Sequence, residues 1–393
     1  MRLATVLGPV MAAGLALTTQ VLAGDPITMD MAHDERRPSI AADERGDLHV
    51  AYVSYEAGAK VPDIFYTFSV DAGKSWSAGV NVSRTPGVSR EPSIACGKDG
   101  HLVIVWLDTT SGMENPDVYG VFSTDGGKTW SDAADISNTP GKSMDPSVAI
   151  ARDGVVHLVW ADTTDSSTGP EIWQSFSSDK GKTWSKAKNI SHTLGDARCP
   201  ALACGGTNDV FVCWSDKLGE KANSEIFFAS SNDGGKSFSR AANVSNTPGD
   251  SSDPRIAVDG SGIYLAWSDS STRAGQRDIF FMASRDGGES WEKYLDVAPT
   301  PGRSTEPAIC AGDGHIAVVW RDTTGHESNP DIWMALSSDH GKSFGAPRDV
   351  SNTPGASKHP DVAIAKGRLQ LVWEEYEKGF THLKHSSLPL GLH

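Results

Sequence analysis

The chain is poor in several features that would assign it to a familiar class. It has only 5 cysteines in 393 residues, and none of them stand in a CxxC spacing. Neither a disulfide framework nor a zinc ribbon is therefore supported, although Cys204 and Cys213 fall on one predicted hairpin where a bridge stays open. Lysine and arginine number 35 against 50 acidic residues, which gives a formal net charge of −15. This charge argues against nucleic acid or an anionic membrane surface as the partner.

Long apolar runs are also missing after residue 24, so we expect no membrane insertion of the mature chain. The first 23 residues read MRLATVLGPVMAAGLALTTQVLA, with one arginine, an apolar run and small residues before Gly24. This order is typical of a secretory signal peptide. We therefore predict export to the periplasm or the extracellular space, with a signal peptide over 1–23 and a single domain over 24–393.

What the chain has in abundance is turn residues and repetition, with 40 glycines and 21 prolines. The stretch STDGGKTW and its near copies occur six times, starting at Ser69, Ser123, Ser177, Ser231, Ser284 and Ser337. A Pro-led apolar run, an alternating strand that ends in an aromatic residue, and a third strand precede each copy. A short fourth strand follows it. A repeat of this length and pattern predicts the four-stranded antiparallel blade of a β-propeller.

The number of blades follows from counting these segments. The chain contains seven first strands and seven second strands, but only six copies of the eight-residue stretch and six fourth strands. The segment from Ile27 aligns with the fourth strand that begins near Asn81. We therefore predict an all-β, seven-bladed β-propeller in which the N-terminal strand completes the last blade. Such closure removes the exposed sheet edges of an open ring.

The repeated stretch itself is interpreted as a folding device. Its Asp can accept backbone N–H groups within a tight turn, and its Gly permits a positive φ. Its closing aromatic residue is large enough to pack on the adjoining blade. The aspartates are Asp71, Asp125, Asp179, Asp233, Asp286 and Asp339, and the aromatic residues are Trp76, Trp130, Trp184, Phe238, Trp291 and Phe344.

The pattern S-x-D-x-G-x-x-[WF] resembles the Asp box, or bacterial neuraminidase repeat, of sialidase-like β-propellers. The resemblance covers essentially the whole chain after residue 24. Sialidases of this family are six-bladed, so a six-bladed ring is the alternative architecture. The family also includes other secreted hydrolases and non-catalytic propellers. The box therefore predicts an architecture and leaves the activity open.

The resemblance implies a sialidase site of three arginines, an acid/base Asp, and a Tyr nucleophile assisted by a Glu. Arg36, Glu306 and Arg321 match part of this pattern. The last first strand reads KHPDVA, however, and holds no tyrosine, and no third arginine is evident. We therefore predict a non-catalytic binding or scaffolding module for a protein or glycan partner in the exported compartment. An exo-α-sialidase or related glycan hydrolase is the alternative, and whether the protein is an enzyme stays open.

The predicted ligand-binding face is a ring around the central opening, made by the residue before each first-strand proline. These residues are Arg37, Glu91, Asp145, Cys199, Asp253, Glu306 and His359. The four carboxylates among them could hold Ca²⁺, which prefers oxygen ligands. A second acidic ring is expected on the same rim after the second strands, at Asp108, Asp162, Asp216, Asp269, Asp322 and Glu375, with Ser54 in the first blade. We interpret these Asp residues as caps of their own loops through Asx turns.

Overall fold

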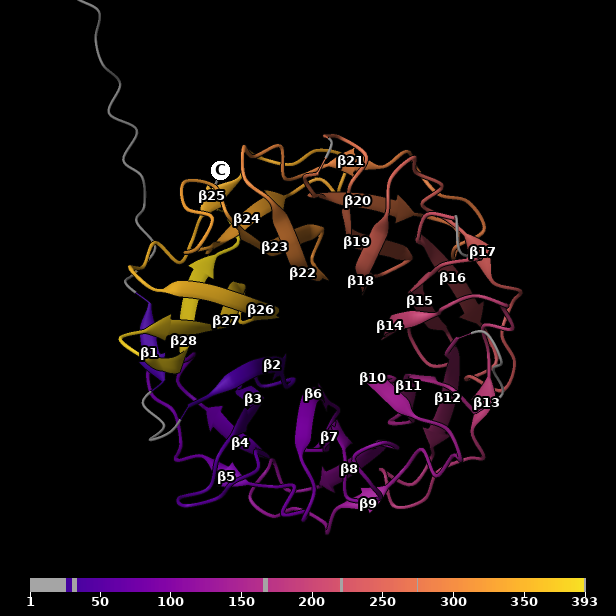
Figure 1. Ribbon diagram of the computed structural model, residues 1–393, viewed down its shortest axis with the longest axis vertical. Coiled ribbons are helices and arrows are strands. Elements are labelled where there is room, and N and C mark those ends of the chain that lie inside the picture. Colours follow the sequence, from indigo (N-terminus) through magenta and orange to yellow (C-terminus); the bar gives the residue numbers. More distant parts are fainter. Residues whose placement is uncertain (1–25, 30–33, 165–168, 220–221, 274, 392–393) are drawn as a thin grey trace, which may run out of the picture.

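The computed structural model is a ring of seven four-stranded antiparallel sheets (Figure 1). The prediction of seven blades is confirmed, and the six-bladed alternative is wrong. The predicted signal peptide lies outside the described residues. Within the described part of the chain, no helical segment has the length and apolarity needed to cross a bilayer. The structure describes residues 26–29, 34–164, 169–219, 222–273 and 275–391.

The blades are numbered along the chain, and each begins with the strand nearest the axis of the ring (Figure 1). Blade 1 holds β2 (Arg36–Ala42), β3 (Leu48–Ser54), β4 (Asp63–Ser69) and β5 (Val80–Asn81). Blade 2 holds β6 (Ser89–Cys96), β7 (Leu102–Asp108), β8 (Asp117–Ser123) and β9 (Ala134–Asp135). Blade 3 holds β10 (Ser143–Ile150), β11 (Val156–Asp162), β12 (Glu171–Ser177) and β13 (Lys188–Asn189). Blade 4 holds β14 (Arg198–Cys204), β15 (Val210–Asp216), β16 (Glu225–Ser231) and β17 (Ala242–Asn243).

The remaining blades follow the same order until the last. Blade 5 holds β18 (Ser251–Asp259), β19 (Gly262–Asp269), β20 (Asp278–Ser284) and β21 (Leu295–Asp296). Blade 6 holds β22 (Ser304–Gly312), β23 (His315–Asp322), β24 (Asp331–Ser337) and β25 (Arg348–Asp349). Blade 7 combines both ends of the chain, with β26 (Ala356–Ala365), β27 (Arg368–Glu377), β28 (Phe380–Pro389) and the N-terminal β1 (Ile27–Met29).

The N-terminal strand closes the ring as predicted. β1 pairs antiparallel with β28, and Met29 stands opposite Leu383. Met29 is buried in a cluster that joins Leu383 of blade 7 to Val50 and Tyr52 of blade 1. Burial of this apolar side chain anchors the strand, because removing apolar surface from water is the main favourable term in folding.

The core lies between neighbouring blades. The aromatic residue near the end of each second strand is fully buried there; these residues are Tyr52, Trp106, Trp160, Trp214, Trp267, Trp320 and Trp373. One cluster, for example, packs Val159 and Ile172 of blade 3 against Trp214 of blade 4. Each sheet thus buries its faces against both neighbours, so the ring is a single packed unit.

The Asp-box turn has the predicted structural role, as the copy in blade 2 illustrates. Asp125 accepts the backbone N–H of Thr129 at 2.9 Å and its hydroxyl at 2.6 Å. Gly127 has a φ of 81°, and a Cβ there would lie 2.2 Å from the Tyr66 hydroxyl of blade 1. Trp130 packs edge-on against the Tyr66 ring at 4.9 Å between centroids. The box therefore fixes its own turn and packs on the preceding blade.

Candidate functional site

The seven residues of the predicted ligand-binding face share the same local backbone structure, and we call them the axial ring. Each lies at a register shift in its innermost strand, and each has a left-handed backbone. Their φ values run from 49° to 56°, at Arg37, Glu91, Asp145, Cys199, Asp253, Glu306 and His359. Non-glycine residues adopt this conformation at an energetic cost, and it persists only where the surroundings enforce it.

Hydrogen bonds between blades supply that enforcement for several members of the axial ring. The Asp145 carboxylate accepts the backbone N–H of Cys199 at 3.1 Å, and Glu306 accepts that of His359 at 2.9 Å. Glu91 accepts a backbone hydrogen bond from Asp145 in the same way. A carboxylate of one blade thus holds the left-handed residue of the next. These side chains connect blades, which gives them a structural role in addition to any contact with a ligand.

Blades 6, 7 and 1 add a chain of alternating acidic and basic groups to the axial ring. Arg321 Nη1 lies 3.9 Å from Glu306 Oε1, and His359 Nε2 lies 4.0 Å from Glu306 Oε2. On its other side, His359 Nδ1 lies 2.9 Å from Glu374 Oε1. Glu374 Oε2 in turn accepts the backbone N–H of Arg37 at 2.9 Å. Sequence reasoning missed Glu374, because its position follows the buried Trp373 on a second strand and shows no motif.

Burial and neighbouring groups shift the pKa values of Glu374 and of two members of the axial ring. Burial raises the pKa of Glu374, but the hydrogen bond and charge of His359 and the N–H of Arg37 outweigh it, so the pKa lies below its usual value. Burial, together with the nearby Asp145 charge, raises the pKa of Glu91 above the usual value. Burial also raises the pKa of the Cys199 thiol, with Asp145 and Asp253 adding to the effect, so this cysteine is not an activated nucleophile.

The structure brings together only two of the three sialidase-like candidates. Glu306 and Arg321 form the pair described above, on the first and second strands of blade 6. Arg36 lies on β2 of blade 1, where its guanidinium pairs with Asp34 at 2.5 Å. The carboxylate of Glu306 is engaged by His359 and Arg321. The three residues therefore do not assemble as a free acid and nucleophile around one point.

The predicted cation rim is not gathered into a metal site. Its carboxylates belong to blades 2, 3, 5 and 6, at Glu91, Asp145, Asp253 and Glu306. Within the described residues, no group of three or more His, Cys, Asp and Glu side chains is placed to hold a metal ion. All five cysteines are free thiols, and Cys204 and Cys213 stand opposite Val210 and Ala201 respectively, not each other.

The second acidic ring does not lie on a rim, contrary to expectation, because its members from Asp108 to Glu375 are fully buried. Asp322 accepts the Trp320 indole N–H at 2.9 Å and the Thr324 backbone N–H at 2.7 Å. The latter bond is the predicted Asx turn, which is confirmed in blades 2, 3, 5 and 6. Buried carboxylates need such partners, so this ring serves the fold.

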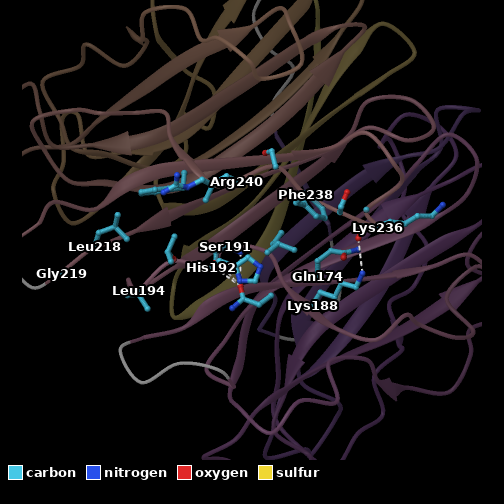
Figure 2. A pocket seen from close by; sticks show the side chains of 18 residues that line it. Gln174, Lys188, Ser191, His192, Leu194, Leu218, Gly219, Lys236, Phe238 and Arg240 are labelled. Carbon is cyan, nitrogen blue, oxygen red and sulfur yellow. Dashed lines mark hydrogen bonds between the residues drawn. The ribbon is translucent and has the colours of Figure 1, made fainter.

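A groove on the perimeter of the ring is the second candidate site, and sequence reasoning did not find it. It lies between the outer strand of blade 3 and the Asp box of blade 4, with a volume of about 890 Å³ (Figure 2). Lys188, His192, Lys236 and Arg240 bring four cationic or titratable side chains to its wall. Its sequence signal is a set of departures from the repeat in blade 4, described below.

The comparisons with known proteins agree with this architecture. Residues 17–264 match the family model described as the BNR repeat-like domain. The chain belongs to the BNR repeat-like domain family. No curated protein matches the chain. The match covers more than half of the sequence and includes the first four Asp boxes.

Solved structures similar to this BNR repeat-like chain include an ulvan lyase of polysaccharide lyase family PL25 bound to -[GlcA(1-4)Rha3S]-. The TM-score is 0.66 at 11% identity, over 93% of this chain and 96% of that one. A protein of unknown function from Dyadobacter fermentans gives a TM-score of 0.56 at 16% identity, over 79% and 96%. The Hadza microbial sialidase Hz136 gives 0.50 at 15%, over 87% and 73%. At these identities the likeness concerns the fold.

Proposed function

We propose that the protein is an exported, non-catalytic binding module of the sialidase-like propeller class, with a protein or glycan as its partner. The observation that carries the proposal is the use of the axial carboxylates. Asp145 and Glu306 each accept the backbone N–H of the next blade, and Glu374 does the same for Arg37. Carboxylates that accept hydrogen bonds between blades are poorly suited to exchanging protons with a substrate.

The requirements of glycoside hydrolysis support the same conclusion. A general acid needs a raised pKa, and a nucleophile needs free access to the sugar carbon. Glu374 has a lowered pKa, and Glu306 is paired with Arg321 and His359. The repeats are nearly equal in length along the sequence, which agrees with a module that presents a rim to a partner. Glu306 with Arg321 is the feature that keeps a hydrolase as the alternative.

Turnover assays test the proposal directly. We expect the purified protein to release neither the fluorophore from a fluorogenic α-sialoside nor unsaturated uronate from ulvan above background. Turnover of either substrate that disappears in Glu306→Gln, with unchanged thermal stability, would establish the hydrolase or lyase alternative instead. The binding arm uses immobilised protein, which should retain a protein or glycan from the exported fraction and from a glycan array. Retention of neither would contradict a binding role.

A further inference from the structure

Blade 4 departs from the repeat at positions that the other blades keep. The loop before its first strand reads TLG at 193–195, whereas TPG stands at 85–87, 139–141, 247–249, 300–302 and 353–355. After the second strand, blades 2, 3, 5 and 6 carry two hydroxyl residues, but blade 4 carries Lys217 and Leu218. Ala197 also replaces a serine that blades 2, 3, 5, 6 and 7 share. These changes cluster at one junction, between blades 3 and 4.

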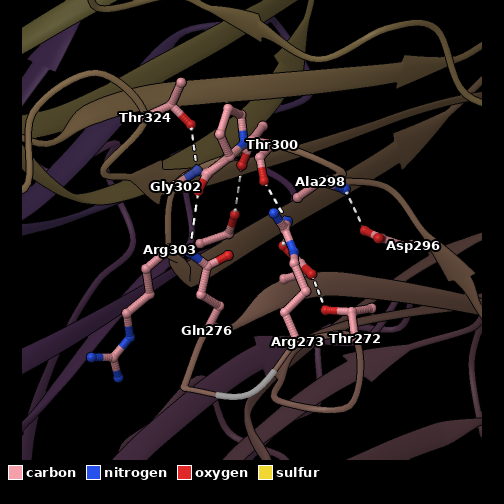
Figure 3. A network of polar contacts seen from close by, with 12 residues as sticks. Thr272, Arg273, Gln276, Asp296, Ala298, Thr300, Gly302, Arg303 and Thr324 are labelled. Atoms are coloured by element: carbon pink, nitrogen blue, oxygen red, sulfur yellow. Dashed lines mark hydrogen bonds and ion pairs between the residues drawn. The ribbon is translucent and has the colours of Figure 1, made fainter.

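The regular junction is held by a pair of hydroxyl hydrogen bonds, and Figure 3 shows one of them between blades 5 and 6, from Gly302 to Thr324. Gly302 donates its N–H to the Thr324 hydroxyl at 2.9 Å, and the Thr300 hydroxyl donates to Asp322 at 2.8 Å. The bond from glycine to hydroxyl recurs at three other junctions, between blades 1 and 2, 2 and 3, and 4 and 5. Leu218 occupies the position of Thr324 in blade 4 and cannot accept such a bond.

The departures weaken the junction. Asp216, the buried equivalent of Asp322, keeps a 3.3 Å bond from the Trp214 indole, but its Oδ1 has no partner among the described residues. In exchange the surface gains Leu194, 84% exposed, and Leu218, 49% exposed. Neither lost hydrogen bonds nor exposed leucines favour folding. Local rules broken without a gain in stability are expected at functional sites, and exposed apolar side chains gathered in one place are typical of interaction surfaces.

The groove formed there has a distinct chemistry, and we call it the 3/4 groove. Leu194 and Leu218 lie toward one end, and Lys188, Lys236 and Gln174 lie toward the other (Figure 2). Lys188 Nζ donates to the Lys236 carbonyl at 3.2 Å, which links blade 3 to the box of blade 4 across the groove. His192 and Arg240 also line the groove, and none of the described lining residues is acidic. This is notable in a chain of net charge −15.

The corresponding groove between blades 1 and 2 is a natural comparison. It is smaller, at about 590 Å³, and Asp132 occupies the position that Arg240 has in the 3/4 groove. Its junction keeps the bond from Gly87 to the Thr110 hydroxyl at 3.1 Å. Within the 3/4 groove, Gln174 is 1% exposed, and its Nε2 has no hydrogen-bond partner among the described residues. An unpaired buried donor that lines a groove favours an incoming acceptor.

We propose that the 3/4 groove binds a segment of a partner protein that carries acidic side chains beside apolar ones. The cations fit the acidic side chains, and the exposed leucines fit the apolar ones. A sugar chain fits less well, because Phe227 is buried in the core cluster and Phe238, which also lines the groove, is partly buried against that cluster. This proposal rests on the proposed role as a binding module, and it names the partner class and the site.

The test measures binding of short, end-capped fluorescent peptides by the full-length protein. One probe has glutamates toward one end and leucines toward the other, and a second has the reverse order, because the groove does not fix the direction. We expect at least one of them to bind, and a glutamine-for-glutamate version to bind about tenfold more weakly. The double variant Lys236→Ala with Arg240→Ala should show a similar loss, since each exposed ion pair contributes modestly. Added NaCl should weaken binding by screening these pairs.

A matched control is available in blade 2, where Lys128 holds the box position that Lys236 holds in blade 4. Lys128→Ala should leave peptide binding unchanged, whereas Leu194→Pro, which restores the TPG loop, should weaken it with no loss of thermal stability. No peptide binding, or equal losses in the Lys128 variant and the groove variants, would overturn the assignment. Preferential binding of oligogalacturonate in this groove would also overturn it and make the partner a glycan. Neither of these results bears on whether the protein is an enzyme, which the turnover assays measure separately.

Discussion

The Glu374 carboxylate of the last blade accepts the backbone N–H of Arg37 in the first blade, with 2.9 Å between Oε2 and N. The two residues are 337 positions apart in the chain. This bond joins the ring on its inner side, whereas the pairing of β1 with β28 joins it on the outside. These two closing contacts are separate, so each can be removed without the other.

We predict that Glu374→Ala destabilises the protein by about 1–3 kcal/mol, because the partly buried N–H of Arg37 loses its acceptor. Urea unfolding of the purified protein measures the change. Glu377→Ala is the control, since Glu377 lies on the same strand and pairs with the exposed Lys378. Its cost should stay within about 0.5 kcal/mol. Equal losses in the two variants would contradict a special role for Glu374.

The difference in the free energy of unfolding between the wild type and Glu374→Ala should depend on pH, because the pKa of Glu374 is lowered. A carboxyl whose pKa is lower in the folded state contributes stability above its unfolded pKa, near 4.3 for Glu. That stability is lost as the pH falls through the folded value. The gap between the wild type and Glu374→Ala should therefore be full at neutral pH and should narrow in acid. A gap that widens on acidification would contradict this linkage.

The outer closure is tested by a pair of substitutions in β1. Met29 is 1% exposed, and Ile27 on the same short strand is 40% exposed. Met29→Ala should cost about 2–5 kcal/mol by removing a buried side chain. Ile27→Ala should cost about 0.5 kcal/mol or less. Deletion of residues 24–34 should lower the melting temperature further than either, and a truncated protein of unchanged stability would rule out closure by β1.

The Asp boxes predict a cooperative loss of stability in acid. The hydroxyl and backbone bonds of Ser75, followed by the Ser69 hydroxyl, lower the pKa of Asp71 to about 2. The Thr129 and Ser123 bonds do the same for Asp125. Because these folded pKa values lie below the unfolded one, near 3.9, their contribution is present above that value and fades toward pH 2. Circular dichroism at decreasing pH should show unfolding in this window, and Asp125→Asn should shift its onset to higher pH.

The architecture could be predicted because the pattern of one blade recurs along the sequence. The spacing of the boxes gave the blade, and the excess first strand with the spare segment at Ile27 gave the closure. The sequence could not show which polar residues meet, since Asp145 and Cys199 touch only when two blades pack side by side. It also placed the ring from Asp108 to Glu375 on the surface, although these residues sit beneath the loops they cap.

The candidate site was the least predictable part, for a related reason. A repeat directs attention to what is shared, whereas a binding site in such a protein arises from what differs. Leu194 and Leu218 show no motif when each is taken alone, and only the structure shows that they line one groove. Glu374 illustrates the same limit, because its role depends on a hydrogen bond from Arg37, which is far from it in the sequence.

The final prediction compares two buried carboxylates, Asp322 at the regular junction of blade 6 and Asp216 at the junction of blade 4, which departs from the repeat. Burial raises the pKa of Asp216, and the bonds from Thr193 and Trp214 do not offset it. Burial acts on Asp322 too, but its bonds from Thr324, Trp320, Ser304 and Thr300 outweigh it, so its pKa is lowered. The Ser304 hydroxyl, which donates to Asp322 at 2.8 Å, has Ala197 as its counterpart in blade 4.

Ala197→Ser should therefore supply the missing donor to Asp216 and stabilise the protein by about 0.5–1.5 kcal/mol. A carboxyl whose folded pKa is raised costs stability as the pH rises above its unfolded value, near 3.9. The gain should accordingly be larger at neutral pH than near pH 4, where the carboxyl is increasingly protonated in both variants. Ser304→Ala is the matched control and should lower stability, most at neutral pH. Destabilisation by Ala197→Ser at both pH values would contradict this prediction. The junction of blade 4 would then not be a regular junction that lacks its hydroxyl groups, and its departures from the repeat would no longer indicate stability lost in favour of a binding surface.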